Sequence, residues 1–261
     1  MAADPMTTSP GENAMLIDEI FHTAYRELEE RMEALAEADG LVFLPNPEPL
    51  GRVHYILICM EPSWGRWTGG SEENARLRVE AGFRNFLFST EDFIVHFCVR
   101  HYLCGPTERY HITDFSKGAM RVKDAARARS QRYDRWYPLL VEEIELLCAS
   151  PSAGIVAFGK DVSQHLARRN FRPFSQVIHY SPLAGLARKR GIVGREDSFQ
   201  AFIGSVSLED VFATAKDVLN AANTPSEIRD DTLARLAKSQ LTTSHQQLIF
   251  NYKVKFESMR S

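Results

Sequence analysis

Short apolar runs alternate with amphipathic segments along the middle of the chain. Four runs have the length and composition of buried strands: residues 52–60 (RVHYILICM), 109–115 (RYHITDF), 154–159 (GIVAFG) and 174–180 (FSQVIHY). Segments with helical spacing of apolar residues lie between them, at 71–88, 91–103, 130–149 and 160–170. Strands that alternate with helices predict an α/β fold with a parallel sheet covered on both faces.

Both ends of the chain extend this α/β core. Residues 1–13 predict a disordered head, and residues 15–38 predict an amphipathic helix that ends before Asp39-Gly40. After residue 206 the pattern predicts two helices and then, over 246–258 (QQLIFNYKVKFES), a strand. We therefore expect an α/β domain over residues 14–206 and a C-terminal extension over 207–261, whose role the sequence does not indicate.

Composition narrows the class of protein. The apolar share of 44% suits a folded core, and no apolar run approaches the roughly 18 residues that a membrane helix needs. The first residues lack the apolar region of a secretion signal, so we expect a cytoplasmic protein without membrane contact. The four cysteines form no CxxC pair and indicate reduced thiols.

Basic residues are clustered although the net charge is only −3. One cluster spans residues 121–135 and another spans residues 188–195. Arginines along a helix form a solvated face more often than a phosphate track, so the clusters alone leave DNA binding open.

Two other patterns are poor matches to cofactor sites. Residues 154–161 (GIVAFGKD) fit GxxxxGK, but Asp161 stands where a phosphate loop needs Ser or Thr for magnesium. Residues 96–104 (HFCVRHYLC) contain two histidines and two cysteines without a standard zinc spacing. We expect neither a metal nor an organic cofactor.

Ligands of parallel α/β sheets bind at the carboxyl ends of the strands, which here carry Glu61, Asp114, Gly159 and His179. Three motifs at these ends, CMEPSW (59–64), ITDF (112–115) and HYSPL (179–183), resemble those of the uracil-DNA glycosylase superfamily in sequence and in order. The resemblance covers residues 40–205. It implies a three-layer α/β/α sandwich around a short parallel sheet and DNA as the partner.

The resemblance also implies catalytic roles for Glu61 and His179. Cleavage of an N-glycosidic bond builds an oxocarbenium-like sugar and an anionic base. Glu61 falls where the family places the polar residue that orients water and stabilises the sugar, and His179 falls where a donor meets the base O2. Taken alone, Glu61 is better interpreted as a helix or turn cap, and His179 as a histidine at the end of a strand with satisfied hydrogen bonds; the paired motifs favour the catalytic roles.

The loop after His179 corresponds to the family's DNA contacts. Leu183 matches the apolar wedge that fills the space of a flipped nucleotide, although its ordinary role is core packing. Ser181 and the backbone of Gly185 are expected against phosphates. The basic side chains that follow, Arg188, Lys189 and Arg190, are expected to contact the DNA backbone.

Three residues are expected to recognise the base. Asp114 replaces the usual Asn of the family. A protonated carboxyl group can donate to N3 and accept from N4–H of cytosine. The same carboxyl group in the opposite orientation also complements uracil. Ser63 stands where some members carry a bulky Tyr that excludes C5 substituents, so it leaves room for one. Phe88, rather than Phe86, is expected to stack on the base. Tyr180 departs from the family's usual Pro.

Asp114 and Ser63 together lead to a functional hypothesis. The protein is expected to be a monofunctional DNA glycosylase that removes a C5-modified cytosine, such as a glycosylated hydroxymethylcytosine, from foreign phage DNA. Removal of ordinary cytosine would damage the host genome, so the modification must provide selectivity. Two alternatives remain open: a repair glycosylase for uracil or another deaminated base, and a DNA-binding module of the same fold that has lost catalysis.

Overall fold

A computed structural model of the 261-residue chain describes residues 10–260. Residues 1–9, and with them most of the expected disordered head, lie outside the described residues. Helix α1 (Pro10–Ala38) confirms the N-terminal helix but begins at Pro10, so residues 10–13 belong to it and not to the head. Within residues 10–260 we find no helix both long and apolar enough to cross a membrane.

The central sheet contains four parallel strands in the order β3-β2-β5-β6. Their bounds are β2 Tyr55–Cys59, β3 Tyr110–Asp114, β5 Gly154–Phe158 and β6 Ser175–Val177. All four expected strands are thus confirmed. The register places Cys59 beside Asp114 and Phe158 beside Val177, so the carboxyl ends of all four strands meet at one edge of the sheet.

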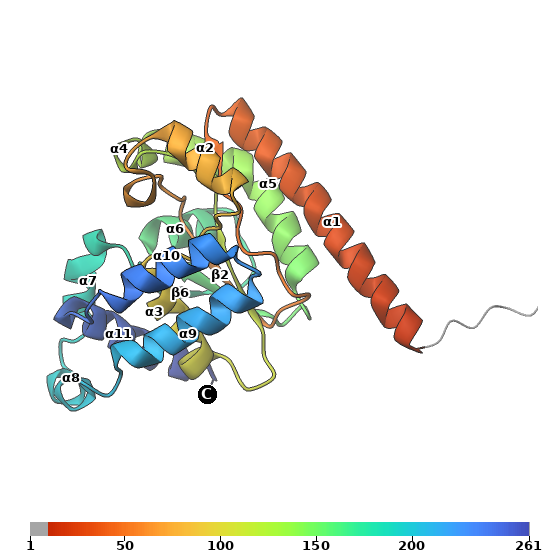
Figure 1. Cartoon of the computed structure of the whole chain (residues 1–261). Helices are drawn as coiled ribbons and strands as arrows, with labels where there is room; N and C mark the ends of the chain where they lie inside the picture. The colour runs from red at the N-terminus through yellow and green to blue at the C-terminus, as the bar shows by residue number, and fades with distance from the viewer. Residues whose placement is uncertain (1–9, 261) are drawn as a thin grey trace, which may run out of the picture.

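Helices cover both faces of the sheet (Figure 1). One layer contains α1, α5 (Arg129–Leu147) and α6 (Lys160–Arg168), and packs on strand residues such as Ile56 and Ile58. The other contains α3 (Thr90–Cys98), α9 (Leu208–Ala221) and α11 (Thr243–Arg260), and packs on Leu57 and Cys59. Successive strand side chains point to opposite faces, so an uninterrupted apolar run supplies both layers. The predicted three-layer α/β/α sandwich is confirmed.

Shorter elements complete the chain. A two-stranded antiparallel pair, β1 (Val42–Phe43) with β4 (Gly118–Ala119), lies outside the main sheet. The short helices are η1 Arg66–Thr68, α2 Glu72–Glu80, the π-helix η2 Val99–Leu103, α4 Val122–Ala125, η3 Pro182–Ala184, α7 Gly185–Arg190, α8 Glu196–Phe202 and α10 Ser226–Ala237. The helix expected over 71–88 therefore ends early, at Glu80.

The strand expected over residues 246–258 is wrong, because this segment belongs to helix α11. Phe250, Tyr252, Val254 and Phe256 alternate with polar residues, which mimics a strand. In the structure α11 contacts α3, η2, α7 and α8, so apolar side chains are covered around much of its circumference. The C-terminal extension therefore shares a hydrophobic core with the sheet.

Candidate active site

Three of the side chains expected to act on a nucleotide lie at the carboxyl ends of the strands. Asp114 is the last residue of β3 and lies beside Cys59, two residues before Glu61. His179 follows β6 and lies against Gly159 at the end of β5, where an added Cβ would come within 3.3 Å of the His179 Cβ. Gly159 has a φ of 87°, so its left-handed conformation and this contact both favour glycine.

Asp114 is a buried carboxyl group with one hydrogen-bond donor. Its side chain is 3% exposed, and the amide of Asn85 donates to its Oδ2. Burial raises the pKa of Asp114 well above its usual range; the nearby ammonium of Lys117 opposes this rise, and the charge of Glu61 adds to it. Burial thus favours the protonated form of Asp114. In that form, the bond from Asn85 favours Oδ2 as the carbonyl oxygen and leaves the proton on Oδ1.

Asn85 is one of the residues that sequence reasoning missed. Its backbone N–H donates to the carbonyl of Pro45, and the next residue, Phe86, has a left-handed φ of 59°. This turn directs the Asn85 amide toward β3. Residues other than glycine rarely adopt a left-handed backbone conformation, and no short sequence motif predicts where one does.

Glu61 is held by helix α5. Its Oε1 accepts hydrogen bonds from Nε and Nη2 of Arg129 at 2.9 and 2.7 Å, and its Oε2 accepts one from the Tyr133 hydroxyl at 2.6 Å. Arg132 adds an ion pair at 3.5 Å. The Glu61 side chain is only 1% exposed, so water does not reach the carboxylate in this state.

The basic cluster at residues 121–135 therefore has a structural use that the sequence did not indicate. Arg129 pairs with both Glu61 and Asp161, and so joins the loop after β2 to the start of α6. Arg129 and Tyr133 are four residues apart, which places both side chains on one face of α5. This four-residue spacing is the sequence signal from which a shared contact of Arg129 and Tyr133 could have been predicted.

His179 is a neutral hydrogen-bond donor. Burial lowers its pKa to about 4, and the positive charges of Arg188 and Arg129 act in the same direction. The backbone N–H of Ser181 donates to its Nδ1 at 3.0 Å, so the proton of the neutral ring is on Nε2. The ring stacks on Tyr180 with centroids 4.7 Å apart. The histidine thus offers one N–H in a fixed orientation.

The loop after His179 exposes an apolar tip. Leu183 lies in η3 with 89% of its surface exposed, so core packing does not explain it. Gly185 begins α7, with open space where a Cβ would lie. Lys189 and Arg190 are exposed at the other end of this helix.

Arg188 requires a correction. It is 2% exposed, and its guanidinium donates to the carbonyls of Tyr180 and Ser181 and to the Ser244 hydroxyl. The expected contact of Arg188 with a phosphate is therefore not supported. Arg188 instead fastens the loop that carries His179 to helix α11.

Ser63 and Phe88 are linked by an aromatic cluster. Trp67 donates from Nε1 to the Ser63 carbonyl at 2.7 Å and stacks on Phe83, whose ring meets the Phe88 ring edge-on at 5.7 Å. The guanidinium of Arg235 in α10 lies 3.9 Å from the centre of the Phe88 ring. A base that stacks on this face of Phe88 therefore has to displace Arg235. Phe86 is 2% exposed and offers no open face.

No known protein family, curated protein or solved structure matches the chain. Among residues 10–260 no group of three or more His, Cys, Asp or Glu side chains is arranged to hold a metal ion.

Proposed function

We propose that the protein is a monofunctional DNA glycosylase that releases a C5-modified cytosine and leaves an abasic site. One observation carries the proposal: the buried carboxyl of Asp114, held by Asn85, lies at the same sheet edge as Glu61 and His179. Burial of a carboxyl group costs free energy unless a ligand or a partner uses it, so such a group is a candidate recognition site.

The protonated form of Asp114, which burial favours, suits cytosine. The Oδ1–H group donates to N3 of the base, and Oδ2 keeps a lone pair for the N4 amino group. Ser63 adds no bulky side chain near C5. A hydroxymethyl or glycosylated hydroxymethyl group on C5 provides the selectivity that protects ordinary cytosine, which favours foreign phage DNA as the substrate.

His179 and Glu61 stabilise the two charges that cleavage creates. The Nε2–H group of His179 donates to the base O2 as negative charge develops there, and it needs no protonation to do so. The Glu61 carboxylate stabilises the oxocarbenium-like sugar. Three hydrogen bonds to Glu61 leave one acceptor site, on Oε2 beside the Tyr133 hydroxyl, and a water can be activated there only once the buried site opens.

The described arrangement is closed, so binding requires an opening step. Leu183 is the exposed apolar side chain that enters the base stack as the nucleotide leaves it, at a cost of a few kcal/mol that the site must repay. Arg235 must leave the face of Phe88 for a base to stack there. No step uses a metal or an organic cofactor.

The test is base release from matched oligonucleotides that contain uracil, cytosine, 5-hydroxymethylcytosine or glucosylated 5-hydroxymethylcytosine. Alkaline cleavage reads the resulting abasic site. Release of a modified cytosine alone supports the proposal, provided that Glu61→Gln abolishes it. Release of uracil alone assigns the protein to repair, and no release from any of them favours a DNA-binding module. The phage hypothesis fails if cells that express the protein restrict modified and unmodified phages equally.

A further inference from the structure

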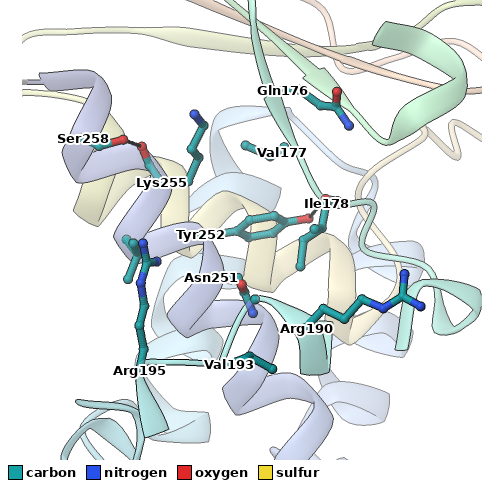
Figure 2. Close-up of a pocket in the computed structure, with 12 residues that line it drawn as sticks. Gln176, Val177, Ile178, Arg190, Val193, Arg195, Asn251, Tyr252, Lys255 and Ser258 are labelled. Atoms are coloured by element: carbon teal, nitrogen blue, oxygen red, sulfur yellow. Dashed lines mark hydrogen bonds between the residues drawn. The ribbon is translucent and has the colours of Figure 1, made fainter. Parts of the chain in front are cut away.

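A groove of about 520 Å³ lies beside β6, an edge strand of the sheet (Figure 2). Its walls come from the edge strand β6, from the connection between α7 and α8, and from the C-terminal helix α11. Figure 2 shows Arg195 and Arg190 on opposite sides of Asn251 and Tyr252, which lie between them on α11. Three separate parts of the chain thus enclose one space.

The lining of this groove is basic. Three of the twelve lining residues are cationic, Arg190, Arg195 and Lys255, and none of the twelve is acidic. All three cationic side chains are exposed, and within the described part of the chain none of them forms an ion pair. Most other arginines of the chain pair with carboxylates or with backbone carbonyls, as Arg129 and Arg188 do. The groove is therefore suited to an anion.

Close packing holds the groove in shape. A Cβ on Gly191 would lie 1.7 Å from Oδ1 of Asn251, so only glycine lets α11 approach the end of α7 this closely. The Asn251 amide donates to the Arg188 carbonyl at 3.1 Å, and the Tyr252 hydroxyl donates to the Ile178 carbonyl at 2.9 Å. The cationic side chains are flexible, but the backbone that carries them is fixed.

The groove continues the surface that carries Leu183. Helix α7 joins them: it begins at Gly185, two residues after Leu183, and ends at Arg190 on the wall of the groove. Six helical residues span about 9 Å. One DNA strand presents a phosphate every 3.4 Å or so along the axis, so the groove lies about three phosphates from the wedge. The exposed Val193 in the lining suits the sugar edge of a backbone.

We propose that this groove binds the phosphodiester backbone of the DNA strand that flanks the flipped nucleotide. The C-terminal extension would then serve as part of the DNA-binding surface, through Lys255 of α11. The inference rests on the proposed function for its choice of DNA as the ligand. Arg195 and Lys255 each neutralise one phosphate.

The experiment measures binding of the full chain to an unmodified duplex at several salt concentrations. Each phosphate contact contributes about 0.9 to the slope of log K against log salt. We expect Arg195→Gln and Lys255→Gln each to reduce this slope by about 1. The matched control is Arg52→Gln, an exposed arginine before the amino end of the inner strand β2 and outside the groove lining. Its slope should equal that of the wild type.

Slopes that stay at the wild-type value in both groove variants overturn the inference, as does a wild-type chain that binds no duplex. Because the duplex contains no modified base, the result is independent of catalysis. If the slopes fall but no base is released from any substrate, the groove assignment stands and the glycosylase proposal fails. If base is released but the slopes do not change, the glycosylase proposal stands and the groove assignment fails. A small anion would be the ligand of the groove instead if two results occurred together: the slopes do not change, and pyrophosphate raises the melting temperature of the wild type but not of the groove variants.

Discussion

The amide of Asn85 donates a hydrogen bond to the carboxyl of Asp114, across 29 residues of sequence. This bond joins the turn after α2 to the carboxyl end of β3, at the edge of the sheet where Glu61 and His179 also lie. It gives one oxygen of a buried carboxyl a fixed role as acceptor. The specificity of the proposed enzyme depends on the proton that remains on the other oxygen.

Exchange of Asp114 for Asn tests this dependence. In Asp114→Asn, the amide can turn to donate to O4 and accept from N3–H of uracil, whereas at cytosine it can donate a hydrogen bond to N3 but cannot transfer a proton to it, as the carboxyl can. We expect release of modified cytosine to fall at least about tenfold, a change of 1.4 kcal/mol in the barrier, and release of uracil to rise. Single-turnover rates on matched oligonucleotides provide the measurement. An unchanged preference would remove Asp114 from base recognition.

The pH dependence of base release separates Asp114 from His179. The pKa of Asp114 is raised by burial, so its proton is lost only as the pH rises through that raised value, and release should decline on the alkaline side. The pKa of His179 is lowered to about 4, so its ring stays neutral across the neutral range and no change should occur near its usual value of 6.5.

A single-turnover pH–rate profile for the wild type and for Asp114→Asn makes the comparison. The alkaline decline should disappear in the variant, while the acid side stays the same. A rate that climbs with pH through the neutral range in the wild type would mean that the deprotonated carboxylate is the active form, contrary to the proposal.

Arg129 should stabilise the folded protein strongly, because it compensates the buried charge of Glu61. In Arg129→Gln the Glu61 carboxylate remains buried with less compensation, which costs about 3 kcal/mol of unfolding free energy at neutral pH. Chemical denaturation of the wild type and the variant at neutral pH measures this loss.

The matched control for this experiment is the double variant Glu61→Gln/Arg129→Gln, in which neither charge is buried. It should recover part of the lost stability. If the single variant is as stable as the wild type, the contact between Arg129 and Glu61 contributes nothing to the stability of the fold.

The sheet was predictable because its strands are apolar runs buried on both faces, and the strand ends followed from the same pattern. Helix α11 was not predictable, because apolar and polar residues alternate from Phe250 to Phe256 as they do in a strand. The burial of its apolar side chains is explained only by contacts with α3, η2, α7 and α8. Local pattern cannot supply such contacts.

The same distinction applies to the site. Glu61, Asp114 and His179 were found from their positions at strand ends. Their partners were not, because Asn85 lies 29 residues from Asp114, and Arg129 lies 68 residues from Glu61. Arg188 shows the opposite error: a run of basic residues suggests a solvated face, but the fold buries one of them against the backbone of Tyr180 and Ser181.

Leu183 offers a test in which function and stability separate. It is 89% exposed, so Leu183→Ala should change the unfolding free energy by no more than about 0.5 kcal/mol. As a wedge it should nevertheless matter for duplex substrates: we expect the single-turnover rate of base release to fall about tenfold or more, and the loss to be smaller on single strands, where little stacking must be broken. Leu50→Ala is the matched control, since Leu50 is 64% exposed and lies before the amino end of β2. Equal losses on duplex and single-stranded substrates would show that Leu183 acts in binding generally and not in extrusion of the nucleotide.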